Sequence, residues 1–263
     1  MWREMIEDYD LDVEDGVDLQ NSFLVGDAAG RAAEGDAVKD FSCSDRDFAA
    51  NVGIAFYTPE EYFLHEAPRG YSRKFEPAEY LSTTSEASID KAVPFTTEKP
   101  HVVLLCGSPG SGKSTFYWNQ LKPFGYERVN QDILKTSAKR DRCMKVMGEY
   151  VSEGKSVAVD NTNADVEVRA KWIELCLRHN VPIFCIYLDT PAPLCEHNDA
   201  VRALNGILMN PEKRTILPKM AFRGFASRFK EPTVEEGFDD VIHVQFKFQG
   251  NDEQRKIWTK YWS

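Results

Sequence analysis

The chain has 263 residues, of which 42% are apolar and 28% are charged. These proportions fit one large or two small globular domains and exclude a disordered, collagenous or coiled-coil protein. No run approaches the ~20 apolar residues of a membrane helix. The opening MWREMIEDYD also lacks the basic and apolar stretch of a secretory signal, so we expect a soluble, intracellular protein.

The net charge of −10 is divided unevenly along the chain. Residues 1–98 contain 8 basic and 22 acidic residues, whereas residues 99–263 contain 24 basic and 20 acidic residues. The first part would repel phosphates and the second could hold them. The six cysteines form no CxxC pair, and Cys106 and Cys185 lie in apolar runs, so we expect reduced core thiols instead of disulfides or a zinc site.

A break in composition separates these two parts. The stretch LSTTSEASIDKAVPFTTEKP is rich in Ser, Thr and Pro and has no sustained period of 2 or 3.6, which is typical of a linker. We therefore predict a first domain at 1–80, a linker at 81–98 and a second domain at 99–263.

Apolar runs alternate with helical stretches beyond the linker. The expected strands are HVVLLC at 101–106, YERVN at 126–130, SVAVD at 156–160, PIFCIYLD at 182–189 and VIHVQF at 241–246. This rhythm predicts an α/β domain with a mainly parallel sheet covered by helices on both faces. In such sheets the active site lies at the carboxyl ends of the strands.

The first run is followed by a full match to GxxxxGK[ST]. The matching segment is Gly107-Ser108-Pro109-Gly110-Ser111-Gly112-Lys113-Ser114-Thr115. In a loop between a strand and a helix, the backbone N–H groups surround a phosphate, the lysine reaches the β- and γ-phosphates and the serine hydroxyl binds Mg²⁺. The alternative is a chance glycine-rich turn. The complete motif after a buried strand predicts a P-loop NTPase domain that binds a nucleoside triphosphate.

The second run ends in Asn130-Gln131-Asp132. A carboxylate at this strand end is placed to accept the proton of an acceptor hydroxyl as that hydroxyl attacks the γ-phosphate. Asp132 would also suit the N-cap of the helix expected from ILKTSAKRDRCMKVMGEYV, and both roles can hold at once.

Three further charged residues are candidates for the same site. Asp160 ends the third run and suits the task of holding water on Mg²⁺, although an ordinary Asx turn is the alternative. Arg169 and Arg202 lie on the helices expected next and could meet the phosphates, the second from a lid. A solvated surface position is the alternative for either arginine. No NKxD-like guanine reader follows, so phosphoryl transfer to a hydroxyl fits better than GTPase switching.

Together these motifs resemble a known family. GSPGSGKST, VNQD, VAVDNTN followed by Arg169, and LPKMAFRGFASRFKEPTVEEGFDDVIHVQF are similar, in order through residues 100–248, to the kinase domain of the polynucleotide kinase 3'-phosphatases, bifunctional DNA end-healing enzymes of eukaryotes. The resemblance implies ATP-dependent phosphorylation of DNA 5'-hydroxyl ends at single strands, nicks or recessed ends, in the nucleus. It implies that Lys113 and Ser114 bind ATP and Mg²⁺. It also implies that Asp132 is the general base and that Arg202 is a lid arginine.

The amino-terminal part resembles the end of the phosphatase domain of the same family, a haloacid-dehalogenase-type module. FLVGDAAGR at 23–31 and DFSCSDR at 40–46 match its last catalytic motif, in which the acid at the Asp27 position helps to hold Mg²⁺. The nucleophile motif DxDGT is missing. The string DYDLD at 8–12 imitates its spacing, but no apolar strand precedes it and no Gly-Thr follows. We therefore expect 1–80 to be a phosphatase remnant without phosphatase activity.

Two departures from the family concern the acceptor side. Gln131 stands where animal members have arginine, and Ala200 replaces an arginine of the lid, so there is less positive charge near the phosphates. We interpret Lys135 as a compensating charge, since the bacteriophage enzyme has an arginine at that spacing. Lys139, Arg140, Arg142 and Lys145 continue the basic run, for which a solvated helix face is the alternative to a DNA-binding surface.

The sequence as a whole predicts a Mg²⁺- and ATP-dependent polynucleotide 5'-hydroxyl kinase. Gln131, Lys135, Lys139 and Arg169 are the expected substrate contacts. Kinases of RNA ends or of a small metabolite, and an ATP-binding scaffold without turnover, are the alternatives. A metabolite kinase would not need the basic run after Asp132.

Overall fold

The computed structural model describes residues 2–9, 11, 16–35, 37–82, 99–131 and 139–262. The chain divides into two compact units. Unit 1 contains the residues up to Glu79 together with Lys256–Trp262, and unit 2 contains Tyr80–Arg255. Within the described ranges, no helix has both the length and the apolar character needed to cross a bilayer.

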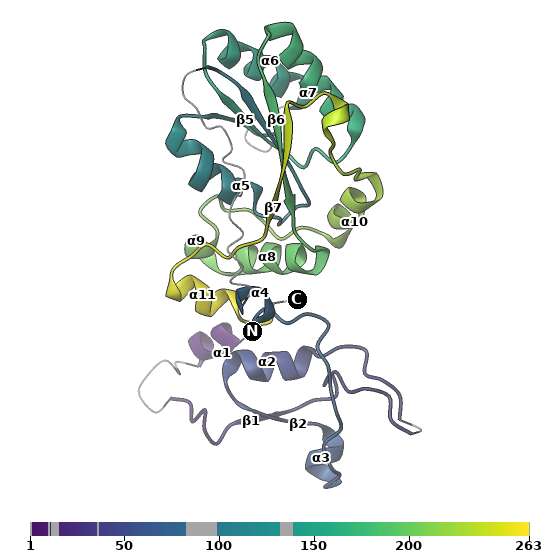
Figure 1. Cartoon of the computed structure of the whole chain (residues 1–263). Coiled ribbons are helices and arrows are strands. Elements are labelled where there is room, and N and C mark those ends of the chain that lie inside the picture. Colours follow the sequence, from purple (N-terminus) through teal and green to yellow (C-terminus); the bar gives the residue numbers. More distant parts are fainter. Residues whose placement is uncertain are drawn as a thin grey trace. The chain divides into compact units, whose positions relative to one another are not determined.

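Unit 2 is built on five parallel strands (Figure 1). In spatial order they are β4 (Glu127–Val129), β5 (Val157–Asp160), β3 (Val102–Cys106), β6 (Ile183–Asp189) and β7 (Asp240–Gln245). All five coincide within one or two residues with the apolar runs of the sequence. The predicted α/β fold with a parallel sheet is therefore confirmed.

Side chains alternate between the two faces of this sheet, and each face has its own core. On one face Val102, Leu104 and Cys106 pack against side chains of the helices α6 (Lys139–Ser152) and α7 (Val166–His179). On the other face Val103 and Leu105 pack against Phe116 and Tyr117 of the helical segment that follows β3. Both faces are covered, which explains why the strands read as continuous apolar runs.

Other helical segments connect these strands, and one more, whose last residues belong to unit 1, follows the last strand. α5 (Lys113–Phe116) continues through a π-helical turn at Tyr117–Leu121 and a 3₁₀ turn at Lys122–Phe124. α8 (Ala192–Leu204), α9 (Gly206–Met209), α10 (Lys219–Arg228) and a 3₁₀ turn at Val234–Glu236 lie between β6 and β7, and α11 (Asp252–Trp258) follows β7. The helix expected after Asp132 begins at Lys139 in the described residues.

Unit 1 contains α1 (Trp2–Asp8), β1 (Phe23–Val25), α2 (Ser44–Val52), β2 (Ala55–Tyr57) and α3 (Pro59–Phe63). The two strands are parallel and pair Phe23 with Ala55 and Val25 with Tyr57. α4 (Glu79–Ser82) begins where unit 1 ends. Most of the expected linker, residues 83–98, lies outside the described residues.

Lys256–Trp262 group with unit 1, whereas the sequence predicted a single second domain at 99–263. The side-chain amide of Asn51 donates to the Tyr261 carbonyl at 2.6 Å and accepts from the Tyr261 N–H at 2.8 Å. The Tyr261 hydroxyl donates to the carboxylate of Glu76 at 2.9 Å. These contacts join positions 210 and 185 residues apart, which sequence periodicity does not register.

Replacing Asn51 with alanine should release this carboxyl-terminal segment. Asn51→Ala leaves the Tyr261 N–H and carbonyl without their partners, which costs about 1–3 kcal/mol where such groups are part-buried. Amide hydrogen exchange of residues 256–262 should accelerate, whereas Tyr261→Phe, which removes only the hydroxyl contacts, should have a smaller effect. Unchanged exchange in Asn51→Ala would show that this pair does not hold the segment.

Candidate active site

The loop after β3 lies where the strand order changes direction. After β3 the chain forms β4 and β5 on one side of β3 and then β6 on its other side. The carboxyl end of β3 therefore lies at the point where the strand order reverses. Ligands in parallel sheets bind at such a point. Gly107–Thr115 occupies it, from the end of β3 into the first residues of α5.

Backbone geometry explains one glycine of this loop. Gly110 has a φ of +75°, and an added Cβ would collide with the Cys195 carbonyl oxygen of α8. The side chain of Asn198, on the same helix, donates to the Gly110 carbonyl at 2.9 Å. A side chain at Gly110 would therefore separate the loop from α8.

Lys113 is turned toward the loop itself. Its Nζ donates to the carbonyl oxygens of Gly107 at 2.9 Å and of Ser108 at 2.6 Å, and it lies 3.3 Å from the Ser111 hydroxyl. The side chain is only 9% exposed. Burial lowers the pKa of Lys113, and the nearby carboxylate of Asp160 opposes this shift. The lysine is thus the cation at the centre of the loop.

Asp160 connects three elements through one carboxylate oxygen. It ends β5, is 2% exposed, and its Oδ2 accepts from the Ser114 hydroxyl at 3.0 Å. The same oxygen accepts from Arg128 Nε at 2.9 Å and Nη2 at 2.5 Å. Asp160 and Ser114 therefore lie together, as expected for a Mg²⁺ site, but Arg128 of β4 was not predicted from the sequence.

Arg128 has a second acidic partner in the loop after α9. Its Nη1 donates to Glu212 at 2.6 Å, and Glu212 also accepts from Trp118 Nε1 at 3.0 Å. Burial would raise the pKa of Glu212, but the hydrogen bonds from Arg128 and Trp118 outweigh it and lower the pKa to about 2. Glu212 therefore keeps its charge at any pH well above 2. Its position, 84 residues from Arg128, is set by the fold.

The end of β4 is fixed against the end of β5. The Asn130 side chain donates to the Asp160 carbonyl at 2.5 Å, and the Gln131 N–H donates to the Asn161 side chain at 3.0 Å. Within the ranges that the structure describes, the buried Nδ2 of Asn161 has no hydrogen-bond partner. Asp132 follows directly in the sequence but lies, like Lys135, outside the described residues, and of Lys139 only the backbone is described.

Arg202 lies on α8, the helix that contacts the loop through Asn198 and Cys195. It lies one turn beyond Asn198 on α8, so both residues share one face. Its guanidinium pairs with the buried carboxylate of Asp199, and its charge adds to the lowering of the Lys113 pKa. Ala200, the departure from the family in this helix, is buried.

Arg169 has a different place from the one expected. Its side chain is fully buried, and Nε and Nη2 donate to the two carboxylate oxygens of Glu236 at 2.8 and 2.6 Å. Its Nη1 donates to the carbonyls of Asn163 and Ala164. This geometry gives Arg169 a structural position between α7 and the turn before β7, instead of the substrate contact predicted from the sequence.

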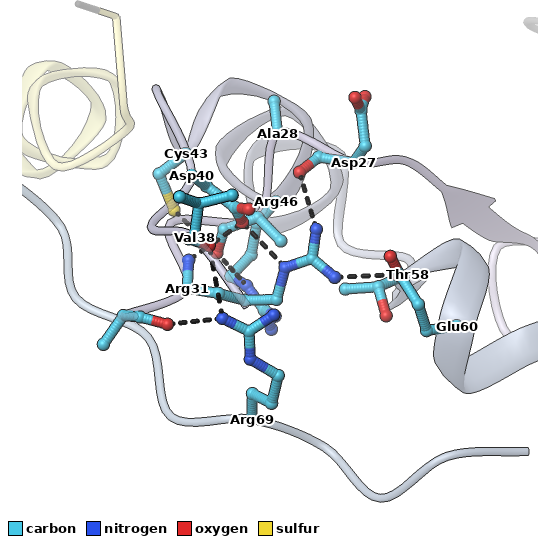
Figure 2. A network of polar contacts seen from close by, with 12 residues as sticks. Asp27, Ala28, Arg31, Val38, Asp40, Cys43, Arg46, Thr58, Glu60 and Arg69 are labelled. Carbon is cyan, nitrogen blue, oxygen red and sulfur yellow. Dashed lines mark hydrogen bonds and ion pairs between the residues drawn. The ribbon is translucent and has the colours of Figure 1, made fainter. Parts of the chain in front are cut away.

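The acid at position 27 in unit 1 is exposed beside a buried arginine (Figure 2). Arg31 donates to Asp40 at 2.8 Å, to Glu60 at 2.7 Å and to the Asp27 carbonyl at 3.3 Å, while the Asp27 carboxylate points away from this network. Burial would raise the pKa of Asp40, but Arg31 outweighs it and lowers that pKa. The network fixes the backbone that presents Asp27.

The residues around Asp160 suit Mg²⁺. This ion uses few protein ligands, takes the rest from water and substrate phosphates, and prefers oxygen. One hydroxyl and one carboxylate at hydrogen-bond distance beside a P-loop meet that requirement. In unit 1, Asp27 stays a prediction, because the described residues contain no cluster of three or more His, Cys, Asp or Glu side chains able to hold a metal.

Known proteins match both units. Residues 1–63 match the family model described as "Polynucleotide kinase 3 phosphatase", and residues 102–232 match the one described as "AAA domain". The resemblance inferred from the sequence motifs is therefore confirmed.

Two relatives align with most of the chain. It is 39% identical over 251 residues to a bifunctional polynucleotide phosphatase/kinase of Schizosaccharomyces pombe, covering 94% of this chain and 56% of that protein. A putative bifunctional polynucleotide phosphatase/kinase of Acanthamoeba polyphaga mimivirus is 34% identical over 86% of this chain and 56% of its own length. The chain thus spans about half the length of these relatives.

Removing Arg169 should affect stability more than catalysis. Arg169→Gln leaves the carboxylate of Glu236 without its buried partner, and breaking such a pair costs about 3–5 kcal/mol. Urea unfolding should show this loss, whereas Arg178→Gln, which breaks an exposed pair with Glu174, should change the free energy of unfolding by less than about 0.5 kcal/mol. A stable Arg169→Gln protein with weakened ATP or acceptor binding would instead return Arg169 to the substrate site.

Proposed function

We propose that unit 2 is an ATP- and Mg²⁺-dependent kinase that phosphorylates the 5'-hydroxyl end of a polynucleotide, with DNA ends as the acceptor. The observation that carries this proposal is the contact between Ser114 and the buried Asp160 beside the Gly107–Thr115 loop. This contact lies at the carboxyl edge of the parallel sheet. The chain is also similar, over 94% of its length, to a bifunctional polynucleotide phosphatase/kinase. The family resemblance also supports a nuclear location.

The nucleotide half of the site follows from residues already in place. Backbone N–H groups of the loop would bind the phosphates, and Lys113 would exchange the loop carbonyls for the β- and γ-phosphates. Ser114 would bind Mg²⁺, and Asp160 would orient a water of that ion. Held by these residues, the ion would supply positive charge that offsets the charge developing on the transferred group.

The acceptor half is assigned to the end of β4 and to α8. Asp132 would accept the proton of the 5'-hydroxyl, and Gln131, held by Asn161, would line the acceptor path. Arg202 would stabilise charge on the transferred phosphoryl group from α8. Lys135 and Lys139 would hold the phosphates of the strand.

Asp132→Asn should separate a catalytic base from a helix cap. Asparagine caps a helix about as well as aspartate, so folding and ATP binding should persist while turnover falls by roughly 10² to 10⁴. Asp132→Ala should show the same catalytic loss with about 0.5–2 kcal/mol of destabilisation. Transfer of labelled γ-phosphate to matched 5'-hydroxyl DNA and RNA strands measures the catalytic effect, and urea unfolding measures the change in stability.

An exposed acid in the first turn of α6, Asp141, provides the control for these variants. Asp141→Asn should phosphorylate the strands at the parent rate. If Asp132→Asn does so too, Asp132 is a cap only. If the parent protein hydrolyses ATP but labels neither strand, the polynucleotide acceptor is wrong and a small-metabolite hydroxyl takes its place.

Charge reversal tests the path of the strand. Lys135→Glu together with Lys139→Glu should weaken binding of a single strand and reduce the slope of log affinity against log salt by about 0.7 for each phosphate that the protein no longer neutralises. ATP affinity should barely change. Lys171→Glu, at an exposed position of α7, is the matched control, and an unaltered slope in the double variant would exclude this path.

A further inference from the structure

The Asp160 carboxylate is paired with an arginine whose side chain is mostly buried. It is 2% exposed, and one of its oxygens accepts two N–H groups of Arg128 as well as the Ser114 hydroxyl. A buried carboxylate is costly unless a positive charge compensates it. Arg128 supplies that charge from β4, with its own side chain only 7% exposed.

Arg128 is held at the same time by a second acid. Glu212 accepts from Arg128 Nη1 at 2.6 Å, and Arg214 Nε donates to the other carboxylate oxygen of Glu212 at 2.8 Å. Asn210 closes the loop that carries both, since its side chain accepts from the Arg214 N–H at 2.8 Å and donates to the Arg214 carbonyl at 2.7 Å. Glu212 therefore has a fixed position.

Aromatic side chains fix the arginine from the remaining side. The guanidinium carbon of Arg128 lies 5.2 Å from the centre of the Tyr117 ring and 5.4 Å from that of Trp118. Such contacts favour a cation at this point. Because Trp118 also donates to Glu212, the arginine has a binding place that does not depend on Asp160.

We propose, building on the nucleotide half of the proposed function, that Arg128 is a positioning residue that stands in for the charge of Mg²⁺ at Asp160, and that Glu212 retains Arg128 when the metal binds. Two cations at one carboxylate repel each other, so Arg128 and Mg²⁺ compete for Asp160. Glu212 weakens the hold of Arg128 on Asp160 and so favours the metal.

Two substitutions that replace a charged side chain with glutamine should change the Mg²⁺ requirement in opposite directions. Glu212→Gln leaves Asp160 as the only carboxylate paired with Arg128, so more Mg²⁺ is needed to displace the arginine from Asp160. Arg128→Gln leaves Asp160 buried without a cation, so the metal-free protein is less stable and less Mg²⁺ is needed. If the contacts of Arg128 with Asp160 and Glu212 were purely structural, each substitution would lower the melting temperature equally with and without metal. The Mg²⁺ requirement would then stay unchanged.

Thermal melting of the full chain tests this. Melting temperatures are measured in EDTA and during a Mg²⁺ titration at a fixed concentration of a non-hydrolysable ATP analogue. Glu212→Gln should raise the Mg²⁺ concentration for half-maximal stabilisation by roughly fivefold to tenfold. Arg128→Gln should melt earlier in EDTA, regain most of that loss with Mg²⁺ and analogue, and require less Mg²⁺ than the parent. Arg128→Lys, which keeps the charge, should stay close to the parent requirement.

The control is Glu153→Gln, which removes the charge of an exposed carboxylate paired with Lys155 and should match the parent. A Mg²⁺ requirement of Glu212→Gln equal to that of the control would overturn the proposal, as would a shift of both variants in the same direction. A parent that is stabilised by Mg²⁺ and analogue but labels no 5'-hydroxyl strand would contradict the acceptor assignment alone. If the parent gains no stability from Mg²⁺ and analogue, both proposals are wrong.

Discussion

One buried carboxylate organises the candidate site. Asp160 joins the P-loop through Ser114 and β4 through Arg128, and its backbone carbonyl also binds the Asn130 side chain. Because the carboxylate is almost inaccessible to water, its charge depends on the hydrogen bonds that it accepts from Ser114 and Arg128. The carboxyl ends of β3, β4 and β5 are thereby fixed relative to one another.

The segments between β6 and β7 are also held by contacts to Asp160 and the P-loop. Through Arg128, the Asp160 carboxylate is connected to Glu212 in the loop after α9. α8 meets the P-loop separately, through Asn198 and the close approach of Gly110 to Cys195. Asp199 on that helix accepts from the Leu217 N–H at 2.7 Å. The polypeptide from α8 to Leu217 is therefore connected to the Gly107–Thr115 loop at one end and, through Glu212 and Arg128, to the Asp160 carboxylate in its middle.

Local patterns in the sequence predicted the strands and the P-loop, because buried parallel strands are continuous apolar runs and the loop has a fixed spacing of glycines and lysine. Ion pairs between distant elements left no such signal. Arg169 was expected to reach a substrate, but its partner Glu236 lies 67 residues away. The pair of Arg128 and Glu212 was missed for the same reason. The only local sign of this pair was the arginine within the short strand ERV.

A crystal structure of the chain with Mg²⁺ and a non-hydrolysable ATP analogue tests the central role of Asp160 most directly. We expect the triphosphate within Gly107–Thr115, Lys113 Nζ on its phosphates, and Mg²⁺ about 2.1 Å from the Ser114 hydroxyl oxygen, with Asp160 within hydrogen-bond reach of a water on the metal. A nucleotide bound elsewhere, or a metal remote from both Ser114 and Asp160, would contradict it.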